Sequence, residues 1–251
     1  MKINKKIIFS AGGTGGHLFP AINLMKHFLN EGYKVLLVTD KRGNNYIKEN
    51  KDFKTYIMRA GTPTKKNIFK KFLSFFTIFN SIIRSIIILK KEKPDLVFGL
   101  GGYVSFPICF SSRFFKFPLV IYENNMVLGR ANKFLISLSK RIFVLKKDTL
   151  NISEKNNYKV CEVGAVLDKN IINHSKDKKN GKEYFSLLVL GGSQGAKIFG
   201  LVIPQVTKML KDKGYNIKIA QQCIEDQIEV LKDFYSENNI QSNIFNFRND
   251  I

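Results

Sequence analysis

Two glycine-rich loops are the parts of the sequence best suited to chemistry. The first spans residues 11–17 and reads AGGTGGH, and the second spans residues 191–197 and reads GGSQGAK. Each loop follows a short apolar run and precedes a segment with helical spacing. Its backbone N–H groups should therefore lie at the amino end of a helix, where the helix dipole favours an anion. We expect both loops to bind phosphate groups, although glycines that only permit a tight turn would give the same pattern.

Neither loop has the spacing of the common nucleotide-binding fingerprints. After Gly13 and Gly15, a dinucleotide-binding loop would need a third glycine where Leu18 stands. The second loop leads to no G-K-[ST], and Ile198 replaces the metal-binding hydroxyl of an ATP-binding loop. The sequence therefore disfavours a dehydrogenase and an ATPase, and a nucleotide-sugar diphosphate is the ligand that suits the two loops.

The segments around the loops predict two α/β domains. Short apolar runs with helical segments between them are typical of a doubly wound parallel sheet. In the first domain these runs are at residues 6–10, 34–39, 95–100 and 118–122. A strand at 186–190 starts the pattern again, and it is followed by a helix at about 196–213, a strand at 216–220, a helix at about 225–235 and a strand ending near 247. We place the boundary near Gly164, which gives domains 1–164 and 165–251.

The composition favours a globular protein of the cytoplasm with an anionic partner. With 251 residues, 44% of them hydrophobic, the chain has enough apolar material for one large domain or two modest ones. Its three cysteines form no CxxC pair, which argues against a disulfide framework or a zinc site. The net charge of +21 favours nucleic acid, acidic lipid or a phosphorylated substrate, although a general enrichment in lysine would also produce it. The first residues lack a signal-peptide pattern.

Several motifs, in register over nearly the whole chain, resemble the MurG family of glycosyltransferases. They are AGGTGGHLFPA at 11–21, GLGGYVSFP at 99–107, YENN at 122–125, GRANKFL at 129–135 and GGSQGAK at 191–197. The resemblance implies a GT-B fold of two Rossmann-like domains. The first domain would bind most of a lipid-linked acceptor, and the second would bind most of UDP-N-acetylglucosamine. It also implies an inverting transfer of N-acetylglucosamine to the MurNAc 4-hydroxyl of lipid I, undecaprenyl-pyrophosphoryl-MurNAc-pentapeptide. The product would be lipid II, made for peptidoglycan at the cytoplasmic side of the bacterial inner membrane.

The resemblance also assigns roles to individual residues. His17 is the candidate general base, because imidazole changes its charge near neutral pH and can take the proton of an attacking hydroxyl; a role in capping the loop or binding phosphate fits its position equally well. The substrate-binding candidates are Thr14, Gly15, Gly16 and Asn125 on the donor, Ser193 and Gln194 on the departing UDP phosphates, and Tyr103 on the acceptor. A packed core position fits Tyr103 equally well. Because aligned amides at a helix start can stabilise a leaving diphosphate, we expect no cofactor and no obligatory metal ion.

The stretch from Thr64 to Lys93 has the composition of a membrane-surface helix. It reads TKKNIFKKFLSFFTIFNSIIRSIIILKKEK, with apolar residues at helical spacing and lysines at both ends. Its longest charge-free run, 72–83, is too short to span a bilayer, which takes about 20 apolar residues. An interfacial helix would place phenylalanines in the acyl boundary and Lys65, Lys66, Lys70 and Lys71 on anionic headgroups. For most of the stripe we favour the more usual interpretation, the core-facing side of a crossover helix.

The sequence departs from the family pattern at three places. Tyr122 stands where the family usually has histidine, and Asp168 stands where it has a donor-contacting arginine. The chain ends at Ile251, and in the family a later helix carries the acidic residue that holds the donor ribose. We therefore expect an incomplete second domain with an exposed sheet edge and poor stability. An alternative function is therefore a catalytically impaired remnant that binds the membrane, the acceptor and other cell-wall proteins. Nucleic-acid binding lacks any recognisable motif.

Overall fold

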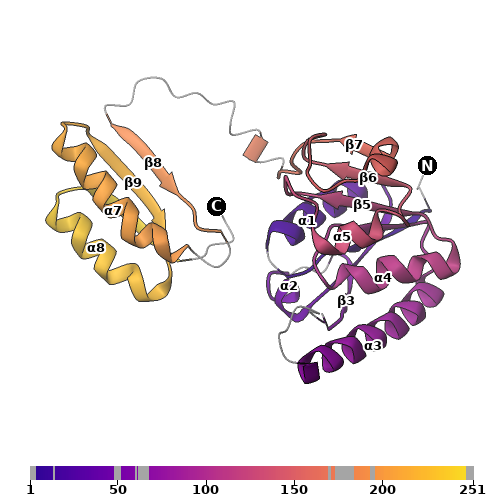
Figure 1. Ribbon diagram of the computed structural model, residues 1–251. Coiled ribbons are helices and arrows are strands. Elements are labelled where there is room, and N and C mark those ends of the chain that lie inside the picture. The colour runs from indigo at the N-terminus through magenta and orange to yellow at the C-terminus, as the bar shows by residue number, and fades with distance from the viewer. Residues whose placement is uncertain are drawn as a thin grey trace. The chain divides into compact units, whose positions relative to one another are not determined.

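Strands and helices alternate along both parts of the chain, as Figure 1 shows for the computed structural model. The structure describes residues 4–13, 15–47, 52–59, 61, 68–168, 171–172, 184–192 and 196–246, with the backbone alone for 68–73. The chain divides into two units, Met1–Ile172 and Asn173–Ile251, whereas the sequence placed the boundary near Gly164. The two α/β units confirm the predicted fold class.

The first unit is built on a seven-stranded parallel sheet with the order β3-β2-β1-β4-β5-β6-β7. Its strands are β1 (Lys6–Ser10), β2 (Lys34–Thr39), β3 (Lys54–Ile57), β4 (Leu96–Gly99), β5 (Leu119–Glu123), β6 (Arg141–Val144) and β7 (Val160–Glu162). The intervening helices are α1 (Gly15–Asn30), α2 (Lys41–Asn45), α3 (Ile68–Glu92), α4 (Ser105–Ser111), η1 (Ser112–Phe115), α5 (Arg130–Leu135) and η2 (Glu154–Lys159). The strand order reverses direction between β1 and β4, and ligands of such sheets bind outside the carboxyl ends of the strands at this switch point.

Helices cover both faces of the sheet, and each face has its own buried cluster. Successive strand residues point to opposite faces, so Ile8 and Phe9 of β1 belong to different clusters. Ile8 lies in the cluster with Leu89 of α3. Phe9 lies in the cluster with Met25 of α1. A sheet buried on both faces explains why β1 and β2 read as continuous apolar runs.

Helix α3 buries three serines and exposes five large apolar residues, whereas Ile88 and Leu89 near its end are buried. Ser74, Ser81 and Ser85 are buried, and the Ser81 hydroxyl donates to the carbonyl of Arg59 at 3.0 Å. Exposed residues on the same helix are Phe75 (75%), Phe76 (57%), Phe79 (58%), Ile83 (43%) and Ile87 (60%). The interpretation that most of the stripe faces the core is therefore wrong for these five residues. The physical reason is that α3 lies very close to the backbone at Gly61, where an added Cβ would lie 2.9 Å from the Ser74 carbonyl oxygen.

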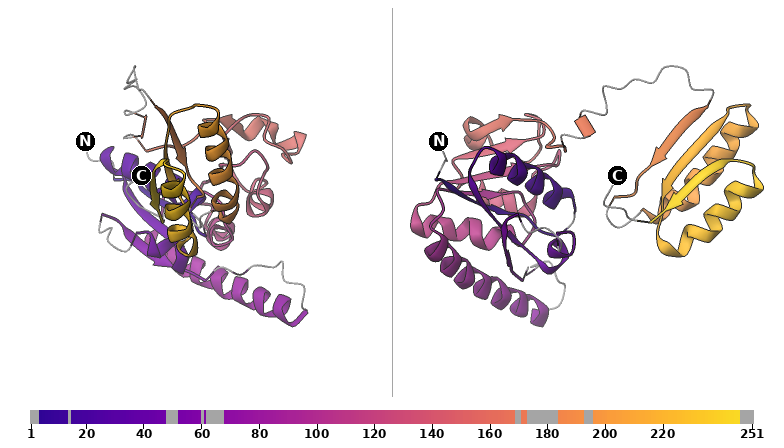
Figure 2. Two further views of the ribbon diagram at one scale, coloured as in Figure 1. Left: turned by 90° about the vertical axis from the view of Figure 1, so that its left-hand side faces the viewer. Right: turned by 180° about the vertical axis from the view of Figure 1, so that it is seen from behind.

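The second unit has a smaller parallel sheet with the order β10-β9-β8. Its elements are β8 (Phe185–Val189), α7 (Lys197–Asp212), β9 (Ile217–Gln222), η3 (Glu225–Gln227), α8 (Ile228–Glu237) and β10 (Gln241–Phe245). Figures 1 and 2 show α7 and α8 on one face of this sheet, where Val189, Ile219 and Leu231 are buried together. On the other face of β8, Leu188 is 56% exposed. The poor stability expected for this domain stays a prediction.

Candidate active site

The first glycine loop connects β1 to α1 at the switch point of the sheet. Ser10, the last residue of β1, pairs with Gly99 at the end of β4, so the segments that follow these two strands are neighbours. They pack backbone against backbone: a Cβ added at Gly102 would lie 2.8 Å from the carbonyl oxygen of Gly12. Glycine in both loops therefore permits a contact that side chains would prevent.

His17 lies in the first turn of α1 and packs its ring on the second of these segments. Gly101 has a φ of +94°, and a Cβ added there would lie 2.9 Å from Cε1 and 3.0 Å from Nδ1 of His17. Both the backbone conformation and the close imidazole thus require glycine at this position. Within the described residues, the buried Nδ1 atom of His17 has no hydrogen-bond partner.

Glu123 organises the loop that follows β5. Its side chain is buried, and each carboxylate oxygen accepts two hydrogen bonds. Oε1 accepts from the backbone N–H of Asn125 at 3.0 Å and from Nδ2 of Asn125 at 2.7 Å. Oε2 accepts from the backbone N–H of Gly129 at 2.8 Å and from Nδ2 of Asn132 at 3.0 Å. Four N–H donors therefore satisfy a buried carboxylate, which holds the loop and the start of α5 in place.

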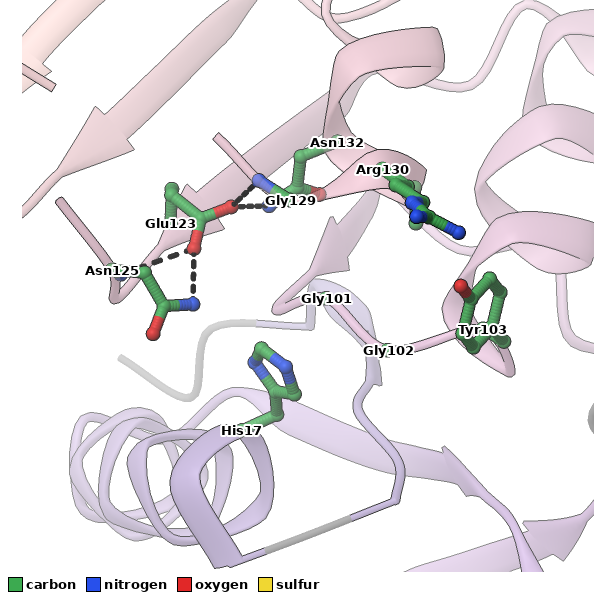
Figure 3. Close-up of a pocket in the computed structure, with 10 residues that line it drawn as sticks. His17, Gly101, Gly102, Tyr103, Glu123, Asn125, Gly129, Arg130 and Asn132 are labelled. Carbon is green, nitrogen blue, oxygen red and sulfur yellow. Dashed lines mark hydrogen bonds between the residues drawn. The ribbon is translucent and has the colours of Figure 1, made fainter. Parts of the chain in front are cut away.

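The same carboxylate orients the side-chain amides of two asparagines. Because the Asn125 NH2 group is turned to Glu123, its amide oxygen points away from Glu123, as Figure 3 shows. Asn132 uses its NH2 group on Glu123 and on the carbonyl of Tyr122 at 3.0 Å. Its Oδ1 atom is buried and has no partner among the described residues. This wall of the site thus offers amide oxygens, which accept hydrogen bonds from O–H or N–H groups.

These segments together enclose a pocket of about 310 Å³ (Figure 3). Its lining residues are His17, Gly101, Gly102, Tyr103, Glu123, Asn125, Gly129, Arg130, Ala131 and Asn132. The structure thus brings together three of the predicted site residues, His17, Tyr103 and Asn125, which come from three separate parts of the chain. The half-buried Tyr103 has part of its side chain on the pocket.

Two further predicted site residues, Gly15 and Gly16, do not line this pocket. Gly15 is buried in the first turn of α1, and Gly16 is exposed beside it. The carbonyl of Gly16 accepts from Nδ2 of Asn124 at 3.2 Å, which joins the first loop to the loop after β5. Thr14, Ser193 and Gln194 lie outside the described residues. Sequence reasoning did not assign Arg130 or Asn132 to the site, although both belong to the GRANKFL motif.

Tyr122, where the family usually has histidine, ties the end of the first unit to the site. Burial raises the pKa of its phenol. The hydroxyl oxygen lies 3.0 Å from Oδ1 of Asn124 and 3.0 Å from the carbonyl oxygen of Gly164, two acceptors for its proton. Val166 packs against the same buried cluster as Tyr122. These contacts keep residues 164–166 with the first unit, which explains why the chain divides later than the predicted boundary.

A glutamine holds the start of the second glycine loop. Gln222, at the end of β9, accepts from the backbone N–H of Gly191 at 3.0 Å and donates to the carbonyl of Gly192 at 2.9 Å. Gly192 has a φ of +73°, a conformation that favours glycine. The loop therefore leaves β8 in a defined direction, as the first loop leaves β1.

Comparisons with known proteins agree with this arrangement. The Glycosyltransferase family 28 N-terminal domain matches residues 7–144, and the Glycosyltransferase family 28 C-terminal domain matches residues 186–251. The crystal structure of Acinetobacter baumannii MurG is similar with a TM-score of 0.71 and 25% identity, over 98% of this chain and 69% of that chain. The fold and the matched domains are those of a GT-B glycosyltransferase, which confirms the predicted architecture.

Two relatives show to which family of glycosyltransferases the chain belongs. A protein from Pelagibacter ubique (strain HTCC1062) is 36% identical over 250 residues, which are 99% of this chain and 68% of the relative. A protein from Rickettsia felis is 36% identical over 246 residues, which are 94% of this chain and 67% of the relative. Both are named UDP-N-acetylglucosamine–N-acetylmuramyl-(pentapeptide) pyrophosphoryl-undecaprenol N-acetylglucosamine transferase. The chain belongs to the MurG family, as its motifs predicted.

Proposed function

We propose that the protein transfers N-acetylglucosamine from UDP-N-acetylglucosamine to the MurNAc 4-hydroxyl of lipid I and so makes lipid II. The names of its relatives describe this donor and this lipid-linked acceptor. The observation that carries the proposal for this chain is the pocket at the switch point, which holds His17, Tyr103 and Asn125 together. A sugar-sized cavity with a histidine in its wall suits the attack of a sugar hydroxyl.

In this proposal His17 acts as the general base of a single displacement. An imidazole nitrogen takes the proton of the acceptor hydroxyl while the hydroxyl oxygen forms a bond to the anomeric carbon. The bond from this carbon to the diphosphate oxygen breaks on the opposite side, and UDP leaves with the electron pair, which inverts the anomeric configuration. Gly101 supports this role, because its missing side chain lets the His17 ring lie against the backbone at Gly101.

The remaining candidates would hold the two substrates. The amide oxygen of Asn125, oriented by Glu123, would accept a hydrogen bond from a hydroxyl or acetamido N–H of the donor sugar. Tyr103 would contact the acceptor. Backbone amides of residues 14–16, together with Ser193 and Gln194, would bind the donor and the departing diphosphate, whose charge grows in the transition state.

We propose that the protein works at the cytoplasmic side of the inner membrane, and helix α3 supports the part of this proposal that concerns binding to an anionic membrane surface. Its outward residues Phe75, Phe76 and Phe79 form an exposed aromatic patch, and Phe114 of η1, which contacts α3, is 60% exposed. Within the part of the chain that the structure describes, none of the helices has the length and apolar character of a transmembrane span. Exposed aromatic rings on a basic protein bind by inserting into the acyl boundary while lysines and arginines meet the headgroups.

A vesicle assay tests this surface. Replacing Phe75 and Phe79 with serine should weaken sedimentation with phosphatidylglycerol vesicles about thirtyfold, because two half-inserted rings contribute about 2 kcal/mol. Phe185→Ser is the matched control, since the exposure of Phe185, 62%, lies between those of Phe75 and Phe79, but Phe185 lies on β8 of the second unit. Equal partitioning of the double variant and the unchanged protein would show that α3 is not the membrane surface.

The transfer reaction is tested with radiolabelled UDP-N-acetylglucosamine and a lipid I analogue. His17→Ala should lower the transfer of label at least about a hundredfold, the usual contribution of a general base. His27→Ala is the control, because His27 is exposed at the other end of α1. If the unchanged protein binds the analogue but transfers nothing, the proposed activity is wrong, and the binding-module alternative is favoured.

A further inference from the structure

The pocket has two walls of opposite hydrogen-bonding character. The wall formed by Glu123, Asn125 and Asn132 presents a buried carboxylate and amide oxygens, with the amide N–H groups turned inward to Glu123. Asn132 lines the pocket and is 2% exposed, and its buried Oδ1 atom has no hydrogen-bond partner among the described residues. Oxygen atoms repel phosphate and attract hydroxyl or N–H donors. A sugar therefore fits this wall, and a phosphate group does not.

The opposite wall carries a cation. Arg130, the first residue of α5, is exposed and lines the pocket with Gly101, Gly102 and Tyr103. Figure 3 shows its guanidinium on the side where Tyr103 lies, across the pocket from Asn125 and Glu123. No described residue forms a hydrogen bond or ion pair with this guanidinium. Its five N–H donors are thus available to a ligand, and their planar fork matches two phosphate oxygens at once.

Other cations near the pocket do not share these properties. Lys133, one turn further along α5, is exposed but does not line the pocket. Arg42 reaches the first glycine loop, but its Nη2 atom is paired with the carboxylate of Asp40 at 3.2 Å. Among the residues that line the pocket, Arg130 is the one with a permanent positive charge.

We propose that Arg130 binds the diphosphate of the lipid-linked acceptor and so determines how the acceptor lies in the pocket. The inference rests on the proposed function, whose acceptor carries a sugar on a pyrophosphoryl lipid. The acceptor sugar lies toward His17 and Asn132, next to the donor sugar that Asn125 contacts. The acceptor diphosphate lies toward Arg130 and Tyr103. The donor diphosphate is the other anion of the reaction, and the proposed function assigns it to residues 14–16, Ser193 and Gln194, whereas Arg130 lies at the start of α5.

Direct binding to the intact chain separates these two anions. Isothermal titration with geranyl diphosphate, a soluble prenyl diphosphate, and separately with UDP compares the unchanged protein with Arg130→Ala and Lys133→Ala. Loss of one charge-assisted bidentate contact should weaken geranyl diphosphate binding by Arg130→Ala about tenfold. Lys133→Ala removes the same charge from the same helix and should change it less than about twofold. UDP binding should be the same for all three proteins.

Three results would overturn the inference. These are equal effects of the two variants on geranyl diphosphate, a loss of UDP binding in Arg130→Ala that matches its loss of geranyl diphosphate binding, or no binding of geranyl diphosphate to the unchanged protein. A thermal melt of each variant shows that the fold is intact. Failure of the proposed function gives a different result, in which label is not transferred although geranyl diphosphate still binds in an Arg130-dependent manner.

Discussion

Replacing Glu123 with glutamine would test how the site is assembled. Glutamine keeps the shape of the side chain but turns one of the two acceptor oxygens into an NH2 donor. Whichever way the new amide turns, this donor faces two N–H groups, either both from Asn125 or those of Gly129 and Asn132. Two hydrogen bonds to a charged acceptor are lost, at about 1.5 kcal/mol each. We therefore expect the segment 119–135 to lose about 3 kcal/mol of stability against opening.

Hydrogen exchange read by mass spectrometry measures this loss locally. Peptides from residues 119–135 should exchange about a hundredfold faster in Glu123→Gln, whereas peptides from the second unit should not change. Glu162→Gln is the matched control, because the exposed Glu162 accepts one backbone hydrogen bond, from Lys147 at 3.0 Å. Its effect should stay below about 0.5 kcal/mol. Equal exchange in Glu123→Gln and the unchanged protein would refute the view that this carboxylate holds the loop.

Two further predictions concern acid stability and the histidine. Burial alone would raise the pKa of Glu92, but hydrogen bonds from two lysines and a tyrosine outweigh it and lower the pKa from 4.5 to about 2. Ionised Glu92 thus contributes at most about 3 kcal/mol to the free energy of unfolding above pH 4.5, and this contribution is lost as the pH falls toward 2. Urea unfolding of Glu92→Gln should lack this pH dependence. Gly101→Ala should lower transfer about a hundredfold by displacing the His17 ring. Gly164→Ala should retain activity, because Gly164 is also at positive φ but no atom of the described residues lies within 4 Å of the added Cβ. Equal activities of the two alanine variants would remove steric displacement as the cause.

The sequence predicted the central strands of the sheet but missed its margins. Strands β1 and β2 were placed within their observed bounds, because strands buried on both faces are continuous apolar runs. Strands β3, β6 and β7 were not predicted. Residues 54–57 read KTYI and residues 160–162 read VCE, and neither β3 nor β7 contains a fully buried residue. Short, partly exposed strands at a sheet edge have too few apolar residues to show a period.

Helix α3 shows what periodicity leaves undecided. The spacing of Phe75, Phe79 and Ile83 predicts one apolar side of a helix, and the helix is present. Which side faces the sheet depends on how closely the neighbouring backbones approach. Ser81 and Ser85 allow the closer contact and are buried, so the aromatic residues point outward. Tertiary packing therefore decided which residues of the stripe are buried and which are exposed.

By itself, the sequence determined the chemistry that the site contains. The glycine loops and His17 were visible as residue types at a spacing that only a strand, a turn and a helix can satisfy. The tertiary structure decided which of these groups meet. Strand order places the loop after β1 beside that after β4, and the carboxylate of Glu123 turns two amides so that their oxygens remain for a ligand. Strand order and side-chain orientation follow from contacts between distant segments, and no local pattern encodes them.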